Sequence, residues 1–343
     1  MKVFITGGAG FIGANLADYH LCRGDEVVVY DNLSRRGADC NLEWLRQRHG
    51  ERLVFGRGDI RDFDALCAAL PEDTARVYHM AGQVAVTTSI VDARQDFEIN
   101  ALGTFNVLEA VRHVSPEVTF FYASTNKVYG GMETTGTVEE PTRYRYRDDP
   151  YALYGVSEAY PLDFHSPYGC SKGSGDQYVR DYARIYDLKT VVMRQSCIYG
   201  PRQLGVEDQG WVAHFCIAAR YGWPINIYGD GKQVRDLLWV EDLIAAYQAA
   251  AERIDIAAGQ IYNLGGGPDN TLSVWAEFGP LLGRLAGHEI AVTFADWRAG
   301  DQPVYVSDIR KAERELGWRP RVGVAQGVAC LWDWVGANPQ LFG

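Results

Sequence analysis

A tyrosine and a lysine spaced by four residues, Tyr168 and Lys172, are the side chains of this sequence that could act together on a substrate. On a helix over residues 167–186 they would lie on one face, one turn apart, with Ser166 and Pro167 as cap and first turn. A phenol with its ordinary pKa of about 10 is a poor base at neutral pH, and a neighbouring lysine ammonium lowers that pKa. The pair could therefore take a proton from a substrate hydroxyl while hydride leaves the same carbon.

Such pairs are also frequent on protein surfaces, so the hydride acceptor must be sought elsewhere in the chain. Residues 2–6 are expected to form a buried strand, followed by a glycine-rich turn and a helix to about Arg23. The glycines of the turn are Gly7, Gly8, Gly10 and Gly13. They let the backbone approach a pyrophosphate, which rests on the helix N-terminus.

A second expected strand, residues 26–30, ends at Asp31, where a carboxylate would bind the adenosine ribose hydroxyls. Strand, glycine-rich turn, helix, strand and acid together predict dinucleotide binding. Asp31 would repel a 2′-phosphate, which favours NAD over NADP. Arg35 and Arg36 keep the phosphorylated cofactor as an alternative, because a nearby arginine can accommodate that phosphate.

Strand and helix signals continue to alternate, which predicts an α/β fold built on a Rossmann-type doubly wound parallel sheet. The further strands are expected at residues 53–55, 77–80, 118–123 and 190–194, and the helices at residues 63–70 and 92–113. Ligands of such sheets bind at the carboxyl ends of the strands. The loops at residues 58–60, 80–82 and 124–127 follow strands, so we expect them to line this crevice.

Composition limits the possible roles of the chain. With 343 residues, 47% of them hydrophobic, it can bury one large core or two. No apolar run approaches the roughly 18 residues that span a bilayer, and the first residues enter a strand directly, so we expect a cytoplasmic protein. Seven scattered cysteines without Cys-x-x-Cys spacing indicate reduced thiols and no metal site. The net charge of -11 disfavours nucleic acid and leaves a small phosphate-bearing ligand possible.

Five segments together resemble the extended short-chain dehydrogenase/reductase superfamily: residues 7–13, 31–34, 58–62, 128–130 and 168–172. The resemblance covers nearly the whole chain. It implies that Tyr168 and Lys172 are catalytic and that Thr125 hydrogen-bonds the reacting hydroxyl. It also implies a set of NAD contacts: Gly7, Gly10, Phe11, Ile12, Gly13, Asp31, Asn32, Ser34, Arg35, Asp59, Ile60, Met80, Ala81, Gly82, Gln83, Asn100, Tyr168, Lys172 and Gln195.

The two residues after Thr125 distinguish the 4,6-dehydratases of this superfamily from its other enzymes. Its sugar-nucleotide 4,6-dehydratases usually carry an Asp-Glu pair directly after the threonine, as acid and base for water elimination. This chain has Asn126 and Lys127 there. Elimination therefore lacks its carboxylates, and reversible oxidation remains, meaning epimerisation or net oxidation or reduction.

Longer segments resemble one subfamily, the CDP-paratose 2-epimerases or tyvelose epimerases: residues 81–90, 124–130, 162–173, 208–211 and 231–236. This resemblance implies inversion at C2 of a CDP-linked dideoxyhexose through a 2-keto sugar, with NAD retained between turnovers. Residues 143–161 depart from the pattern and could alter which sugar is accepted. The alternatives are a UDP-hexose 4-epimerase, a different 2-epimerase, an NAD-dependent reductase, or a dinucleotide-sensing protein with a dead site. The last usually loses the tyrosine or the lysine, and both are present here.

The C-terminal half is expected to bind the nucleotide sugar. Helices are predicted at residues 211–220 and 240–253, and strands at residues 226–228, 236–238 and 261–264. Guanidinium groups bind phosphate oxygens bidentately, and the resemblance points to Arg235 and Arg298 for the diphosphate and to Asp301 for the ribose. The other expected substrate contacts are Asn126, Lys127, His165, Cys197 and Trp211. Of these, His165 stands beside a helix cap, where a lone histidine is more often structural.

These assignments predict two domains. Residues 1–194 would form the NAD-binding Rossmann domain, with residues 233–258 packing back on it. Residues 195–232 and 259–343 would form a smaller α/β substrate-binding domain. By resemblance, the helices at residues 92–113 and 167–186 would form the interface of a homodimer.

Overall fold

The computed structural model describes residues 1–298 and 300–342. The chain forms two compact units, of which the first consists of Met1–Val128, Ser166–Arg194 and Tyr247–Tyr262. The second consists of Tyr129–His165, Gln195–Ala246 and Asn263–Gly343. This division differs from the predicted domains mainly at residues 129–165, which the sequence analysis placed in the NAD-binding domain. The strands β6 and β7 of that segment pair with each other, and Tyr146 donates a hydrogen bond to the Val304 carbonyl, 3.1 Å away.

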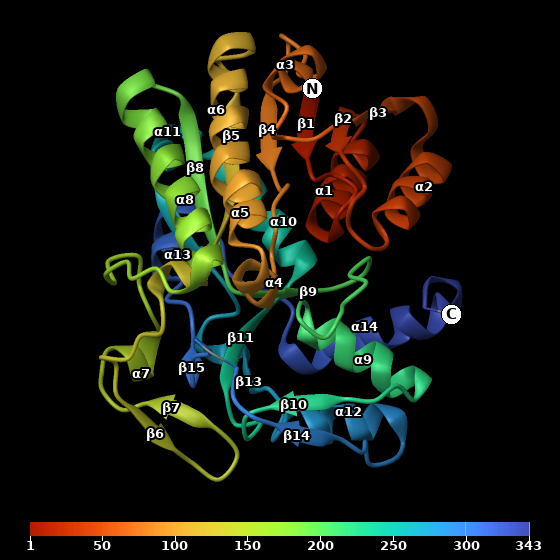
Figure 1. Ribbon diagram of the computed structural model, residues 1–343, viewed down its shortest axis with the longest axis vertical. Helices are drawn as coiled ribbons and strands as arrows, with labels where there is room; N and C mark the ends of the chain where they lie inside the picture. Colours follow the sequence, from red (N-terminus) through yellow and green to blue (C-terminus); the bar gives the residue numbers. More distant parts are fainter. Residues whose placement is uncertain (299, 343) are drawn as a thin grey trace. The chain divides into compact units, whose positions relative to one another are not determined.

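The first unit contains a seven-stranded sheet in the order β12-β8-β5-β4-β1-β2-β3 (Figure 1). Its strands are β1 (Lys2–Thr6), β2 (Glu26–Asp31), β3 (Leu53–Arg57), β4 (Arg76–His79), β5 (Thr119–Thr125), β8 (Lys189–Gln195) and β12 (Ile261–Leu264). The pairs β1–β2, β1–β4, β2–β3 and β4–β5 are all parallel. The order from β3 to β8 is that of a doubly wound dinucleotide-binding sheet, so the predicted fold class is confirmed.

Helices cover this sheet, and their apolar faces form its core. They are α1 (Phe11–Cys22), α2 (Ala38–His49), η1 (Gly50–Arg52), α3 (Phe63–Ala69), α4 (Val86–Val91), α5 (Ala93–Phe97), η2 (Glu98–Leu102), α6 (Gly103–Val114), α8 (Ser166–Tyr186), α10 (Val240–Glu252) and α11 (Ile254–Ala257). Helices α6 and α8 pack side by side (Figure 1). Apolar residues of the sheet and of these two helices, among them Phe120, Val107 and Val179, form one buried cluster.

Two predictions in this unit need correction. The single helix expected at residues 92–113 is α5, a π-helical turn η2, and α6 in succession. A π turn inserts one extra residue into the helix and occurs frequently at functional sites, and a hydrophobic periodicity of 3.6 residues does not reveal it. Helix α2 was not predicted, because only Ala38, Asn41, Leu42 and Leu45 of its residues are buried and its apolar stripe is narrow.

The second unit has its own core and smaller sheets. Its elements are η3 (Asn126–Tyr129), β6 (Thr137–Glu139), β7 (Tyr144–Tyr146), α7 (Tyr151–Tyr154), β9 (Cys197–Tyr199), α9 (Trp211–Tyr221), β10 (Asn226–Tyr228), β11 (Val234–Trp239), η4 (Pro268–Asn270), β13 (Thr271–Ser273), α12 (Phe278–Ala286), β14 (Thr293–Ala295), β15 (Val304–Tyr305), α13 (Arg310–Leu316), α14 (Val324–Ala337) and η5 (Pro339–Leu341). Strand β11 pairs with β13, β15 and β9, and β10 pairs in parallel with β14. Helices α9, α12 and α14 bury their apolar faces in one cluster with Trp239. Among the described residues, no helix is long and apolar enough to cross a membrane.

Candidate active site

Helix α8 positions the Tyr168–Lys172 pair at its first turns. The Gly169 N–H donates to the Ser166 hydroxyl over 3.3 Å, so Ser166 caps the helix in the predicted way. The Tyr168 N–H is satisfied by the Ser89 hydroxyl of α4, 3.1 Å away. Tyr168 and Lys172 are buried, with 7% and 5% of their surfaces exposed. Both side chains therefore lie on one helix and are largely excluded from water.

The Tyr168 phenol does not have the low pKa that the sequence led us to expect. Its burial raises the pKa to about 12, and a hydrogen bond from Thr125 and the charge of Arg35 lower it only in part. The expected lowering by Lys172 is not among the effects on this phenol, and removing water from a phenolate costs more than Thr125 and Arg35 return. Thr125 is the last residue of β5 and is 8% exposed, so the hydroxyls of Thr125 and Tyr168 are both largely shielded from water.

The Lys172 ammonium is also affected by burial, which lowers its pKa to about 7. It lies over the Tyr122 ring, 4.3 Å from the ring centre. Asp176 and Asp96 oppose the effect of burial by stabilising the charged form. The pair thus combines a phenol that resists losing its proton with an ammonium that loses its proton easily, a combination typical of groups that exchange protons.

Asp176 is fixed by a buried ion pair one turn after Lys172. Its carboxylate accepts two hydrogen bonds from the Arg194 guanidinium of β8, over 2.8 and 2.9 Å, and one from the Ser124 hydroxyl over 2.7 Å. The Arg194 and Asp176 side chains are 2% and 0% exposed. This pair joins α8 to β8 and to the end of β5, the strand that carries Thr125.

The glycine-rich turn fits the pyrophosphate of a dinucleotide. Gly7 has a φ of +68°, and a Cβ there would lie 2.5 Å from the Ala81 nitrogen. A Cβ on Gly13 would lie 2.2 Å from the Gly7 oxygen. No side chain caps the N-terminus of α1 at Gly10, so its first N–H groups can bind an anion. Phe11 and Ile12, the other residues predicted here, form the first turn of that helix.

Asp31 ends β2 beside this turn. One of its oxygens accepts the Ala9 N–H over 3.0 Å and the other accepts the Leu33 N–H over 2.8 Å. A carboxylate held in this way keeps lone pairs for two ribose hydroxyls. Asn32 donates to Asp59 over 3.0 Å, and its own oxygen accepts the Ser34 N–H over 3.0 Å, so these three predicted residues belong to one local network.

The loop after β4 meets the first turns of α8 through Asn100. The side-chain oxygen of Asn100 accepts a hydrogen bond from the Gln83 N–H over 2.9 Å. Its side-chain nitrogen donates to the Gln83 carbonyl over 3.0 Å and to the Ser171 hydroxyl over 3.2 Å. A Cβ on Gly82 would lie 3.8 Å from the Lys172 ammonium nitrogen. The loop is anchored to β1, since the Met80 and Ala81 N–H groups bond the Thr6 carbonyl and hydroxyl. Ile60 is buried in the core cluster of the first unit.

Of the remaining predicted residues, two belong to the first unit, Asn126 and Lys127, and four to the second, His165, Gln195, Cys197 and Trp211. Asn126 and Lys127 form the turn η3 directly after Thr125, and Gln195 ends β8. The His165 ring lies 3.2 Å from the exposed Asp163 carboxylate, a contact that a structural role would also explain. Cys197 is in β9 and Trp211 begins α9, where its indole packs edge-on against Phe278.

The two candidate diphosphate arginines each face a carboxylate. Arg235 bonds Asp301 over 2.5 Å, and Arg298 bonds Asp208 over 3.0 Å. The Arg298 guanidinium also lies 3.9 Å from the centre of the Tyr228 ring. Glu207, which the sequence analysis missed, accepts hydrogen bonds from Tyr228 over 2.8 Å and from Asn226 over 3.1 Å.

The sequence analysis also missed the acids around the catalytic pair, Asp96 and Asp176. Asp176 follows Lys172 by four residues, so the helical spacing alone could have placed it on the same face. Asp96 has no such signal, because it reaches the pair from a different helix.

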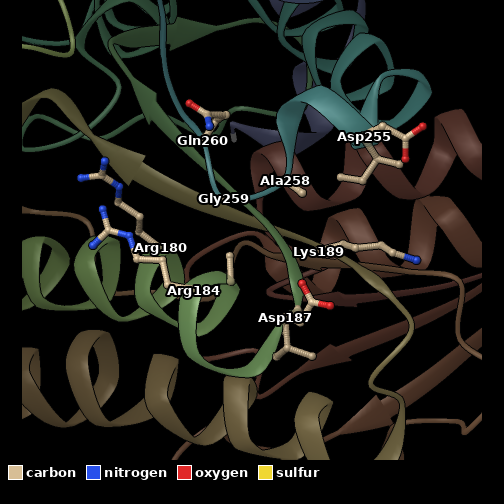
Figure 2. A pocket seen from close by; sticks show the side chains of 11 residues that line it. Arg180, Arg184, Asp187, Lys189, Asp255, Ala258, Gly259 and Gln260 are labelled. Carbon is tan, nitrogen blue, oxygen red and sulfur yellow. The ribbon is translucent and has the colours of Figure 1, made fainter.

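Two other features of the described residues, a cavity and a cluster of possible metal ligands, are not proposed as functional sites. A cavity of about 500 Å³ lies at the far end of α8, between Arg180, Arg184, Lys189 and Gln260 (Figure 2). Its cations diverge, with Arg180 and Arg184 pointing to one side and Lys189 to the other. Asp18, Cys22 and His49 have the types of metal ligands, but the Arg48 guanidinium lies 2.8 Å from Asp18 and already supplies a positive charge.

Together, the doubly wound sheet, the glycine cradle and the buried Tyr–Lys pair define an NAD-dependent enzyme of the short-chain dehydrogenase/reductase type. The chain belongs to the GDP-mannose 4,6 dehydratase family, whose model matches residues 4–331. It is 45% identical to the CDP-paratose 2-epimerase of Salmonella typhi, over 97% of this chain and 99% of that protein. It is 32% identical to the UDP-glucose 4-epimerase of Mycolicibacterium smegmatis, over 96% of each protein.

Among solved structures, the dTDP-glucose 4,6-dehydratase DesIV of Streptomyces venezuelae, with NAD and TYD bound, superposes with a TM-score of 0.83 at 29% identity. The match covers 99% of this chain and 98% of that one. NAD is therefore the cofactor of this enzyme, and its relatives are epimerases and dehydratases of nucleotide sugars.

Proposed function

We propose that this enzyme inverts C2 of a CDP-linked dideoxyhexose, converting CDP-paratose to CDP-tyvelose. The observation that carries the proposal is the similarity along nearly the whole chain to the CDP-paratose 2-epimerase of Salmonella typhi. The residues after Thr125 support it, because Asn126 and Lys127 stand where a dehydratase would need its acid and base.

Tyr168 is the acid and base of the proposed reaction. It takes the proton of the C2 hydroxyl, and it returns a proton after the 2-keto sugar has presented its other face. Thr125 orients the hydroxyl and then the ketone through the hydrogen bond that it shares with the phenol. Lys172 supplies the positive charge that favours the phenolate.

Bound NAD supplies the hydride acceptor for this chemistry. The N-terminus of α1 would bind its pyrophosphate, Asp31 its adenosine ribose, and Lys172 its nicotinamide ribose. The reaction has no net redox change, so we expect NAD to remain bound between turnovers.

Arg235 and Arg298 would hold the diphosphate of the substrate. Each guanidinium is already paired with a carboxylate, Asp301 and Asp208 respectively. A phosphate offers the same bidentate acceptor geometry as a carboxylate, so either pair can exchange one partner for the other.

The test is a proton NMR time course with purified enzyme and CDP-paratose, first without added cofactor and then with NAD. Formation of CDP-tyvelose without added cofactor is the expected result, and it would establish the substrate, the inversion at C2 and the retained NAD together. No conversion under either condition would contradict the proposed substrate.

A UDP-hexose 4-epimerase is the second candidate, because the chain is also similar to UDP-glucose 4-epimerases. The same NMR assay with UDP-glucose separates the two proposals. Conversion of UDP-glucose to UDP-galactose without conversion of CDP-paratose would select this alternative.

We also propose a cytoplasmic homodimer. Large apolar side chains are exposed on α4, α5, η2, α6 and α8: Ile90, Val91, Phe97, Leu102, Phe105, Tyr178, Ile185 and Tyr186. An apolar surface of this kind usually marks an interface. Light scattering is expected to give twice the chain mass of 38.2 kDa, and a value of one chain mass would contradict the dimer. The seven cysteines are all free thiols, as suits a reducing compartment.

A further inference from the structure

Asp96, on α5, is a fully buried carboxylate with three hydrogen-bond donors around it. One oxygen accepts the Ser171 hydroxyl over 2.5 Å. The other accepts the side-chain amides of Asn100 and Gln83, each over 3.1 Å. Burial raises the pKa of this carboxyl, while the donors Ser171 and Asn100 and the charge of Lys172 lower it by favouring the ionised form, which can only accept hydrogen bonds.

These three partners come from different parts of the site. Ser171 directly precedes Lys172 on α8, Asn100 lies in the π-helical turn η2, and Gln83 lies in the loop after β4. The loop was predicted to contact NAD. A single buried carboxylate thus connects the catalytic helix, the irregular turn and the cofactor loop.

We propose that Asp96 is a positioning residue of the catalytic pair: its carboxylate fixes Ser171, and therefore the next residue Lys172, against the cofactor loop, and supplies negative charge to the buried ammonium. The proposal rests on Tyr168 and Lys172 acting as the acid–base pair, as in the proposed function. It assigns to Asp96 an effect on proton affinity in addition to the packing effect of any buried hydrogen bond.

The charges that face Lys172 come from several elements. Asp176 lies on its own helix and Asp96 on α5, and both raise the Lys172 pKa. His79 of β4 is uncharged at neutral pH, because burial lowers its pKa to about 3. Tyr122 of β5 presents its ring, and burial keeps its phenol protonated by raising its pKa.

The two acids near Lys172 differ in the groups that donate hydrogen bonds to them. Asp176 forms a bidentate pair with Arg194, although its charge still raises the Lys172 pKa more than that of Asp96 does. Among the described residues, the hydrogen bonds to Asp96 come from uncharged groups, Ser171, Asn100 and Gln83. Its negative charge therefore acts on the Lys172 ammonium without a guanidinium bound to the carboxylate in the described part of the chain.

Asp96 acts on Tyr168 as well. Its charge raises the pKa of that phenol, while the Thr125 hydrogen bond and the charge of Arg35 lower it. Removal of the Asp96 charge should therefore lower the pKa of both members of the catalytic pair. Loss of packing alone gives no reason for two pKa values to move in the same direction.

The first test needs no substrate. The sequence contains only six lysines, so an NMR titration of NAD-loaded enzyme with ¹³C-labelled lysine can follow each one, and Lys172→Arg identifies the Lys172 signal. In Asp96→Asn the midpoint of that signal should fall by about one pH unit. Asp181→Asn, at an exposed acid further along α8, should leave the midpoint unchanged.

The second test is the dependence of epimerisation rate on pH, with CDP-paratose as substrate. Both limbs of the profile should shift to lower pH in Asp96→Asn. Ser171→Ala removes a hydrogen bond and keeps the charge, so it should lower kcat without moving the Lys172 midpoint. Asp96→Glu, which restores the charge, should return the midpoint toward that of the unchanged enzyme.

An unchanged Lys172 midpoint in Asp96→Asn would overturn the proposal, whatever happens to the rate. If Asp96→Asn does not fold, Asp96→Ser removes the same charge with a smaller side chain and decides the question by the same titration. If CDP-paratose is not converted, the proposed substrate fails, and the lysine titration still tests the role of Asp96.

Discussion

One ion pair beside α8, Asp176–Arg194, and one in the second unit, Arg298–Asp208, lie in different surroundings. The Asp176–Arg194 pair is almost completely buried, with side-chain exposures of 0% and 2%. The Arg298–Asp208 pair is much more accessible, with exposures of 28% and 48%. A buried pair cannot open without leaving a charge in a medium of low polarity, whereas an exposed pair opens into water at little cost. The first arrangement fixes a geometry, and the second leaves a cation free to exchange its partner for a phosphate.

The largest expected effect comes from removing the reacting hydroxyl within the fixed geometry. Tyr168→Phe should lower kcat by about 10³-fold, because a positioned acid–base group contributes on that order. The NAD content of the purified protein should stay the same, since the ring and helix remain. Near-normal epimerisation in an NMR assay would exclude Tyr168 as the acid and base.

Breaking the buried pair should reduce stability instead. Arg194→Met leaves the buried Asp176 carboxylate without its ion-pair partner, which should lower the free energy of unfolding by about 3–5 kcal/mol in urea denaturation. Arg298→Met is the matched control and should change it by less than about 1 kcal/mol, because its pair is exposed. Equal losses in the two variants would contradict the contrast between the two regions.

Arg298→Met should act on substrate binding. A charge-assisted hydrogen bond contributes about 1.5–3 kcal/mol, so KM for the nucleotide sugar should rise by roughly tenfold or more while kcat changes little. Initial rates over a range of substrate concentrations measure both constants. An unchanged KM would mean that Arg298 is a surface arginine bound only to Asp208.

The smallest expected effect concerns the choice of cofactor. Asp31→Ser removes the acceptor for the adenosine ribose hydroxyls and the charge that repels a 2′-phosphate. NAD affinity should fall by about tenfold and NADP affinity should rise, as measured by fluorescence titration of cofactor-free protein. Stronger binding of NADP than of NAD by the unmodified enzyme would instead mean that Arg35 or Arg36 governs this site.

Local patterns were enough to predict the N-terminal strands and the dinucleotide turn of the first unit. The strands at residues 2–6 and 26–30 and the glycine-rich turn between them are found within one residue of the prediction, since continuous apolar runs and glycines leave few other conformations. The second unit was harder to predict from the sequence. Its short strands β6, β7, β13, β14 and β15 have two or three residues each, which is too few to show a periodicity.

The candidate catalytic residues show the same difference between what local spacing predicts and what it does not. Tyr168, Lys172 and their cap lie on one continuous helix, so their spacing alone placed them on one face. The pKa of Tyr168 could not be read from that spacing, because burial among distant segments raises it by more than its neighbours lower it.

The sequence by itself determined the Rossmann-type sheet, the dinucleotide turn and the pairing of Tyr168 with Lys172, because each depends on residues close together in the chain. Only the tertiary structure decided which acids surround the pair. Asp96 comes 76 residues before Lys172 and Arg194 comes 18 residues after Asp176, and both are placed by the packing of α5 and β8 against α8. Electrostatic effects depend on distance and burial, and neither is set by the order of residues along the chain.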